Sequence, residues 1–557
     1  MAKTRHSRHV KHIRHIKHIR EIRHIEKPKK HKEVRHKEAP KPTNVIAEYN
    51  IQADNVPGTV NVIKRPEEYT PVYDVKFPRI GVSTEAVLDS IKEKLIETVK
   101  IELSEILDPK ATEGIKARFL ESADKLITRE LPRITSSEKE ILSGYLVHEM
   151  LGLGRLEVIL NDDALEEIVV NNSNEPLWVF HKQFGWLKTN IVIPTEEQIY
   201  NYASIIGRRI GRQITNLNPL MDAHLQTGDR VNATLFPIST KGNTITIRKF
   251  RREPWTMVHF IDPNVKTISL EIAALLWLAM QYELNILVAG GTASGKTSVL
   301  NALMPFIPPT QRIISIEDTR ELRLPDFLHW IPLTTREANP EGKGEVGMLD
   351  LLINSLRMRP DRVVVGEVRR EREAEVMFEA MHTGHSVYAT LHADRAEQVV
   401  RRLTNPPINL PESLLEALHL VVVQFRHRRL GIRRTLEVAE LLPTDIGGKM
   451  GARLEILYRW RPKTDTIEKV KESIRLIDEI RLHTGMSDED MARDLKEKQQ
   501  ILTWMLKNDV KTVNTVGKIV ADYYHDRQKV LSIVRRNGKP EEILGSNLMK
   551  EMTEPAV

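Results

Sequence analysis

The segment GGTASGKT, residues 290–297, has the residue types and spacing of a phosphate-binding loop. It fits the pattern G-x4-G-K-[ST], and an apolar stretch precedes it while a helical pattern follows. Glycines let backbone N–H groups curl around a phosphate, and the following helix N-terminus adds positive potential. In this pattern Lys296 bridges the β- and γ-phosphates, and the Thr297 hydroxyl is placed to bind Mg²⁺. The sequence therefore predicts a nucleoside triphosphate site. Its expected residues are Gly290, Gly291, Thr292, Ala293, Ser294, Gly295, Lys296, Thr297 and Ser298.

Two further apolar segments end in carboxylates that could support hydrolysis, which needs an acid near the metal and a polarised water. RVVVGEVR places Glu367 after three valines and a glycine, and RIISIEDTREL places Glu317 and Asp318 after another strand-like run. Carboxylates at the carboxyl edge of a parallel sheet lie on its ligand-binding side. We expect Glu367 to serve the metal or its water, and either acid to polarise the attacking water. A loop acid at a strand end is the alternative for each.

The segment MHTGHSVYATLHAD contributes three histidines. His392 closes the apolar run and is expected to reach the γ-phosphate region, directly or across a subunit boundary. For His382 and His385 a structural role is an equally open alternative. The guanine-recognition pattern N-K-x-D does not occur, so ATP is the expected nucleotide.

The apolar segments also indicate the fold. Short β-branched runs alternate with helical stretches across residues 251–470, as in a parallel sheet that helices cover on both faces. The later part of that region has an antiparallel pattern, and residues 471–557 are predicted to be helical. We expect a linker and helices in residues 43–153, and a small α+β subdomain in residues 154–250. The predicted fold class is therefore α/β, with a helical bundle and a small α+β domain before the sheet.

The composition excludes several classes of protein. The 557 residues contain no cysteine, which rules out disulfides and cysteine-based zinc sites and fits a reducing compartment. The most apolar run, residues 268–280, is too short to span a bilayer and contains Glu271, so it predicts a buried helix. We therefore expect a cytoplasmic protein.

The net charge of +7 is concentrated in one segment. Residues 1–42 hold 15 Lys or Arg and four acids, a net +11, so the remaining chain is net −4. Isoleucine recurs every third residue from Ile13 to Ile25, a period that gives no fixed stripe on an α-helix. This segment reads as a disordered basic arm. Alternatively it binds anionic lipid or nucleic acid, more strongly as its eight histidines protonate; metal binding is a weaker reading.

Taken in order, GGTASGKT, IISIEDTREL, MRPDRVVVGEVR and MHTGHSVYATLHAD resemble the Walker A, Asp-box, Walker B and His-box elements of type II/type IV secretion ATPases. The resemblance extends upstream through NPLMDAHLQTGDRVNATLFPISTKGNTITIRKF and spans roughly residues 140–430. FIPP after the first motor helix and the helices around Tyr523 and Tyr524 are similar to the archaeal branch, which assembles type IV pilus-like filaments and the archaellum.

This resemblance implies an N-terminal domain joined to a RecA-like motor, six subunits in a ring, and ATP between the two domains. Arg230 and Arg248 match family arginines that reach the phosphates from the N-terminal domain; a surface role is the alternative for both. The implied partner is a polytopic membrane platform protein, on which the motor acts from the inner face of the membrane. The chain departs from the family pattern in its basic arm, and without cysteine it cannot carry the tetracysteine zinc module of some members.

Three functions follow, in decreasing order of support. The first is an Mg²⁺-dependent ATPase that powers filament assembly or secretion. The second is a conjugation- or helicase-like ATPase on nucleic acid, against which the net acidic body and the lack of interleaved basic and aromatic strands both weigh. The third is a nucleotide-binding scaffold in which Glu317 and Glu367 are inert.

Overall fold

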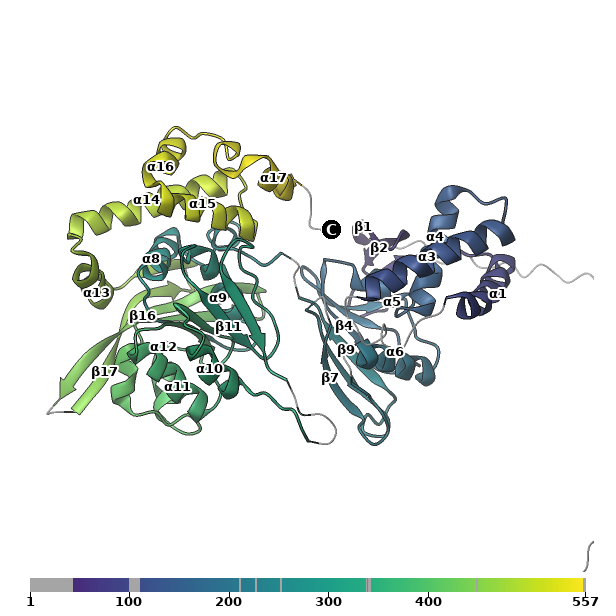
Figure 1. The fold of residues 1–557 in the computed structure, drawn as a ribbon, viewed down its shortest axis with the longest axis horizontal. Helices are drawn as coiled ribbons and strands as arrows, with labels where there is room; N and C mark the ends of the chain where they lie inside the picture. The colour runs from purple at the N-terminus through teal and green to yellow at the C-terminus, as the bar shows by residue number, and fades with distance from the viewer. Residues whose placement is uncertain are drawn as a thin grey trace, which may run out of the picture.

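The computed structural model describes residues 44–553 except 100–110, 210–211, 226–227, 251–252, 337, 339–341 and 447–448. Two nine-stranded sheets organise this part of the chain, one in an N-terminal domain and one in the domain that carries the phosphate-binding loop (Figure 1). Residues 1–42 lie outside the described residues, so the expected lipid, nucleic-acid and metal contacts of the basic arm stay predictions.

The N-terminal sheet has the strand order β1-β2-β3-β6-β5-β4-β9-β8-β7, and its neighbours are antiparallel except for β3 and β6. Its two-residue periodicity is clear in β9, where Ile245 and Ile247 are fully buried and Arg248 is exposed. Helix α6 (Glu196–Arg209) contacts β7 and β9 and buries its apolar residues in the same core. The strands are β1 (Val45–Ala53), β2 (Val56–Ile63), β3 (Val72–Lys76), β4 (Leu165–Val170), β5 (Trp178–His181), β6 (Gly185–Thr189), β7 (Leu220–His224), β8 (Arg230–Thr234) and β9 (Thr244–Arg248).

The prediction of a linker and helices for residues 43–153 is wrong in its first part, because residues 45–76 form β1, β2 and β3. Asp54 and Asn55 turn the first hairpin with positive φ angles of 46° and 67°, the backbone that a tight hairpin turn requires. This Asp-Asn signal was present in the sequence. Because β3 pairs with β6, the strands join the sheet of residues 154–250, and the division at residue 153 does not follow the sheet.

The predicted helices follow, and they pack around a core of their own. They are α1 (Val82–Thr98), α3 (Ala111–Glu130) and α4 (Ser136–Met150). Helix α4 begins with a capping box in which the side chain of Thr135 accepts from the backbone N–H of Glu138 at 3.2 Å. A short helix, α5 (Leu156–Leu160), connects this group to the sheet.

The second sheet has the order β12-β11-β13-β14-β10-β15-β16-β17-β18. Its first six strands are parallel and its last three antiparallel, as predicted. The strands are β10 (Ile286–Gly290), β11 (Ile313–Glu317), β12 (Trp330–Thr334), β13 (Arg362–Val365), β14 (Ser386–Leu391), β15 (Leu420–His427), β16 (Ile432–Ile446), β17 (Lys449–Arg461) and β18 (Thr466–Lys469).

Helices cover both faces of this sheet, so its strands are buried on both sides. Val364 belongs to the core on one face, while Val363 and Val365 belong to the core on the other. On the first face lie α7 (Met257–Phe260), α8 (Leu270–Gln281), α9 (Lys296–Leu303) and the 3-10 helix η1 (Met304–Phe306). On the second lie α10 (Met348–Leu356), α11 (Glu371–His382), α12 (Ala396–Thr404) and the 3-10 helix η2 (Glu412–Ala417).

The C-terminal helices pack above α8 and complete the first core (Figure 1). The apolar run at residues 268–280 forms the buried helix α8, as predicted. Within the described ranges, no helix has the length and apolar character that a membrane span requires. The C-terminal helices are α13 (Arg475–Thr484), α14 (Asp488–Lys507), α15 (Val513–His525), α16 (Arg527–Arg535) and α17 (Glu541–Thr553).

Candidate functional site

The loop between β10 and α9 has the backbone of a phosphate cradle. Gly290 and Gly295 have φ angles of 153° and 96°, in the region that favours glycine. Ala293 also has a positive φ angle, of 58°. A Cβ on Gly290 would lie 2.5 Å from the carbonyl oxygen of Gln424 on β15, so the loop can pass this strand only as glycine. The Ser294 hydroxyl is buried and has no hydrogen-bond partner among the described residues. The loop therefore offers free polar groups of the kind a phosphate satisfies.

Lys296 begins α9 and supplies the positive charge of the loop. Its Nζ donates to the Gly291 carbonyl at 3.3 Å. Burial lowers the pKa of Lys296, while the negative charges of Glu367, Glu321 and Asp394 act to raise it. The first turn of the helix also contains Thr297 and Ser298. The lysine, the backbone N–H groups of the loop and the N-terminus of α9 therefore lie together, as the binding of a triphosphate requires.

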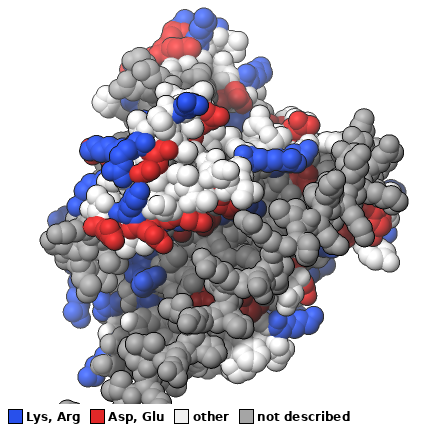
Figure 2. All heavy atoms as spheres, turned by 90° about the vertical axis from the view of Figure 1, so that its right-hand side faces the viewer, with Lys and Arg blue, Asp and Glu red and all other residues white. Residues whose placement is uncertain are grey.

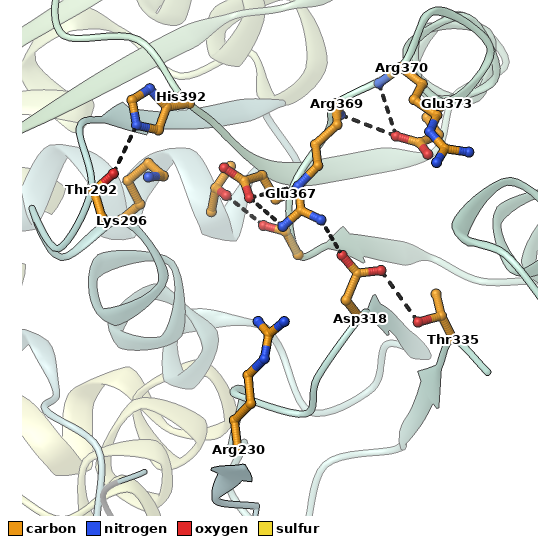
Figure 3. Close-up of polar contacts among 12 residues, drawn as sticks. Arg230, Thr292, Lys296, Asp318, Thr335, Glu367, Arg369, Arg370, Glu373 and His392 are labelled. Atoms are coloured by element: carbon orange, nitrogen blue, oxygen red, sulfur yellow. Dashed lines mark hydrogen bonds and ion pairs between the residues drawn. The ribbon is translucent and has the colours of Figure 1, made fainter. Parts of the chain in front are cut away.

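Glu367 follows β13 at the same edge of the sheet, and its negative charge acts to raise the pKa of Lys296. Its Oε2 accepts from Arg369 Nη2 at 2.7 Å and Nε at 3.0 Å. The other end of the guanidinium reaches Asp318 Oδ2 at 2.7 Å, and Thr335 donates to Asp318 Oδ1 at 3.3 Å (Figure 3). Arg369 therefore links the acids that follow β11 and β13.

Glu317, the last residue of β11, is 2% exposed. Its Oε1 accepts from the backbone N–H groups of Glu321 at 2.9 Å and Leu322 at 3.0 Å. Its Oε2 is buried and has no hydrogen-bond partner in the described part of the chain. Burial raises the pKa of Glu317 to about 7, against the opposing effect of the two N–H groups. A carboxyl group in this state can gain or lose a proton near neutral pH.

The three histidines lie at opposite ends of β14. His392 follows the strand at its carboxyl end, where its Nε2 lies 3.3 Å from the Thr292 hydroxyl of the loop (Figure 3). His382 and His385 precede the strand, and their ring nitrogens contact the carbonyl oxygens of Leu414 and Ala380, both at 3.3 Å. These contacts fit the structural alternative for both residues.

The N-terminal domain presents its two candidate arginines side by side. Arg230 on β8 and Arg248 on β9 are directly paired, so both lie on one face of the sheet. Arg230 donates to Asp222 at 3.0 Å through Nε, and this hydrogen bond is the main reason why its pKa is raised. The negative charges of Asp318 and Glu321 in the second domain act in the same direction, and the Arg230 side chain points toward Asp318 (Figure 3).

Arg248 has different surroundings. Its guanidinium carbon lies 5.8 Å from the centroid of the Phe250 ring, and its charge lowers the pKa of Glu167, against the larger effect of burial. Both of these neighbours belong to the N-terminal domain. The structure thus directs Arg230 toward Asp318 of the other domain and places Arg248 beside it.

Sequence reasoning missed two arginines at the site. Arg369 lies two residues after Glu367, and the pattern GEVR contained it, but nothing in the pattern showed that it would join Asp318. Arg433 on β16 donates through Nε to the Ala293 carbonyl at 3.2 Å, across 140 residues of sequence. Only the pairing of β15 with β10 and β16 brings it to the loop.

Comparison with known proteins agrees with the site. Residues 209–441 match the model of the family described as type II/IV secretion system protein. An uncharacterised protein of Methanocaldococcus jannaschii is 35% identical over 421 residues, 74% of each chain. A putative conjugal transfer protein of Mycobacterium tuberculosis is 33% identical over 307 residues, 53% of this chain and 85% of that one. The type IV secretion system protein PtlH of Bordetella pertussis is 32% identical over 306 residues, 49% and 89% respectively.

Solved structures show weaker likeness. The VirB11 ATPase of the Brucella suis type IV secretion system is 27% identical over 50% of this chain and 90% of that chain, with a TM-score of 0.26. The pilus retraction motor PilT is 18% identical over 66% and 93%, with a TM-score of 0.37. The assignment accordingly rests on the sequence relatives and on the site itself. The chain belongs to the type II/IV secretion system protein family, as an ATPase of that family.

Proposed function

We propose that this ATPase is an Mg²⁺-dependent motor that powers assembly of a type IV pilus-like filament or archaellum, or secretion by a related machine. The observation that carries the proposal is the position of Arg230. It belongs to the N-terminal domain, yet the charges of Asp318 and Glu321, which follow β11 in the other domain, act on it. A site completed by a second domain can couple hydrolysis to movement of that domain.

The residues of the loop fit the nucleotide. Backbone N–H groups of residues 290–297 and the Lys296 ammonium would hold the phosphates, and the Thr297 hydroxyl would bind Mg²⁺. The ion, when bound, neutralises phosphate charge. Glu367 would serve the metal or its water, and the buried Glu317 carboxylate would take a proton from the attacking water. His392 would sense the γ-phosphate through its place beside Thr292.

Residues 249–256 between β9 and α7, the linker that joins the two domains, support the same mechanism. Arg323, in the segment after β11, pairs with Glu253 of the linker at 3.2 Å, and its backbone N–H donates to Asn301 of α9 at 2.9 Å. The linker is thereby connected to the helix that follows the phosphate-binding loop. A change at the phosphates would shift α9, and this contact would pass the shift to the linker and to Arg230.

The family resemblance supplies the setting. The proposed assembly is a ring of six subunits, each acting at the inner face of the membrane on a polytopic platform protein. Relatives from Methanocaldococcus jannaschii align over 74% and 88% of the chain, which supports the archaeal branch. Tyr524 donates to the Phe306 carbonyl at 2.7 Å, so the two features that suggested this branch are in contact.

The described side chains on one face of the N-terminal domain show no basic stripe of the kind that binds nucleic acid. Figure 2 shows one face of the N-terminal domain, where basic and acidic side chains are interspersed and acidic groups border an uncharged patch. A nucleic-acid-binding face would instead gather Lys and Arg into a stripe.

The test is ATP hydrolysis by the full chain with Mg²⁺, measured alone, with vesicles rich in anionic lipid, and with DNA. Stimulation by the vesicles but not by DNA, lost when residues 1–42 are deleted while basal hydrolysis is kept, supports the membrane-bound motor. Stimulation by DNA alone would replace it with a nucleic-acid ATPase. Unchanged vesicle binding after the deletion would reject the lipid role of the basic arm.

A further inference from the structure

Arg433 touches the phosphate-binding loop from the side that carries no acid expected to act in hydrolysis. Strand β10 is hydrogen-bonded to β14 on one side and to β15 on the other. The hairpin of β15 and β16 continues past the loop, and there Arg433 Nε donates to the Ala293 carbonyl at 3.2 Å. Its Cδ would lie 3.8 Å from a Cβ on Gly295, in van der Waals contact. Arg433 is thus packed against two loop positions of positive φ.

A second arginine stands beside it. Arg426 on β15 is directly paired with Arg433 on β16, so the two side chains share one face of the hairpin. The Nε of Arg426 is buried, and it has no hydrogen-bond partner in the part of the chain that the structure describes. Two like charges placed directly opposite each other destabilise a strand pair. An anionic or aromatic group bound on this face would offset that repulsion.

The position of the hairpin indicates which part of a nucleotide it would meet. The acids Glu317 and Glu367 follow β11 and β13, and His392 follows β14, all on the β14 side of β10. A γ-phosphate directed to these groups leaves the ribose and base at the opposite end of the molecule. On the side of β10 away from these groups, the neighbouring element is the hairpin of β15 and β16.

We propose that Arg433, supported by Arg426, forms the wall that contacts the purine nucleoside of the bound nucleotide, with its guanidinium plane against the base. A guanidinium presents a flat, weakly hydrated surface that stacks on aromatic rings. Its Nε meanwhile keeps the wall attached to the loop through Ala293. The inference rests on the proposed ATP site, and it adds a residue that binds the nucleoside rather than the phosphates.

The N-terminal domain contributes to the same place. Burial lowers the pKa of Arg433, and the negative charge of Glu166 on β4 acts to raise it across the boundary between the domains. A residue of the N-terminal domain is therefore within electrostatic reach of the proposed wall.

Separate binding of ATP and of inorganic tripolyphosphate tests the proposal, because only ATP has a nucleoside. We expect Arg433→Ala in the full chain to weaken ATP binding about five- to thirtyfold while tripolyphosphate binding stays within about twofold. Arg433→Lys should resemble Arg433→Ala, since an ammonium keeps the charge but lacks the plane. Arg429→Ala, an exposed arginine at the turn of the same hairpin, is the matched control and should change neither.

The contrary outcomes are distinct. Equal loss of both ligands would show that Arg433 only supports the loop, and full ATP affinity in Arg433→Lys would show that charge and not stacking is at work. Unchanged ATP affinity in Arg433→Ala would remove the contact altogether. Lys296→Ala should lose both ligands; if the wild-type chain binds neither, the proposed nucleotide site itself fails, whatever Arg433 does.

Discussion

Arg369 Nη2 lies 2.7 Å from Oε2 of Glu367, the carboxylate that we expect to serve the metal and its water. The same guanidinium reaches Asp318 at 2.7 Å, so the acids that follow two neighbouring parallel strands are joined through one cation. The ion pairs hold the Glu367 carboxylate near Asp318, at the edge of the sheet where its charge acts on Lys296. This relationship leads to the first prediction.

Replacing Glu367 by Gln should leave ATP binding almost unchanged but slow hydrolysis by several hundredfold. The amide keeps the shape and a hydrogen-bond acceptor for Arg369, but it lacks the charge that the transition state requires; loss of one such group costs about 3–4 kcal/mol. Phosphate release measures the rate, and binding of a fluorescent ATP analogue measures the affinity. The control is Glu371→Gln, an exposed acid four residues on. Hydrolysis at the wild-type rate in Glu367→Gln would remove this residue from the mechanism.

Glu317 should make stability depend on pH. Its pKa is raised from 4.5 to about 7 in the folded chain, so the folded state favours the protonated form. The stability from this group is therefore fully present below pH 4.5 and is lost as the pH rises through 7. Glu317→Gln does not titrate, so its free energy of unfolding relative to wild type should rise by about 2 kcal/mol between pH 5 and pH 8. Denaturant unfolding at both pH values tests this, and a difference independent of pH would contradict it.

The two arginines of the N-terminal sheet should differ in their effect. Arg230→Ala should reduce kcat on the order of 100-fold with little change in ATP affinity, because it removes a charge directed at the developing charge of the reaction. Arg248→Ala should reduce it less than about tenfold, since Arg248 lies against Phe250 and near Glu167. Steady-state kinetics of both variants gives the comparison. A larger loss in Arg248→Ala would reverse the assignment.

One hydroxyl bridges the C-terminal helices and the domain that carries the phosphate-binding loop. Tyr524 accepts from Trp277 Nε1 at 2.8 Å and donates to the Phe306 carbonyl at 2.7 Å. Tyr524→Phe leaves both buried groups unpaired and should lower the free energy of unfolding by about 2 kcal/mol. Tyr69→Phe, at a fully exposed tyrosine, is the control. Equal stability of the two variants in denaturant would show that the hydroxyl contributes nothing.

Much of the motor could be predicted because its signals are local. A parallel sheet brings the carboxyl ends of its strands to one edge. The sequence alone therefore predicts that the loop glycines, Lys296 and the acids that end apolar strands lie at that edge. The separation of His392 from His382 and His385 also follows from which end of β14 each one occupies.

Other features depend on contacts between distant parts of the chain. Arg433 meets Ala293 only because β15 pairs with β10, and no local pattern carries that pairing. The strands β1–β3 have only weak alternation of apolar and polar residues. The helical periodicity that follows them is stronger and favours a helical assignment for the whole segment. The effect of the Asp318 charge on the pKa of Arg230 depends on the relative orientation of the two domains.

The measurement that tests the central claim most directly is phosphate release from ATP by the purified full chain, with Mg²⁺ and with EDTA, beside Lys296→Ala. We predict steady turnover by the wild-type chain with Mg²⁺ and none above background with EDTA. We also predict none from Lys296→Ala, because the ammonium that contacts the β- and γ-phosphates is gone. Turnover in Lys296→Ala equal to wild type, or equal turnover without Mg²⁺, would contradict an ATPase site at the loop of residues 290–297.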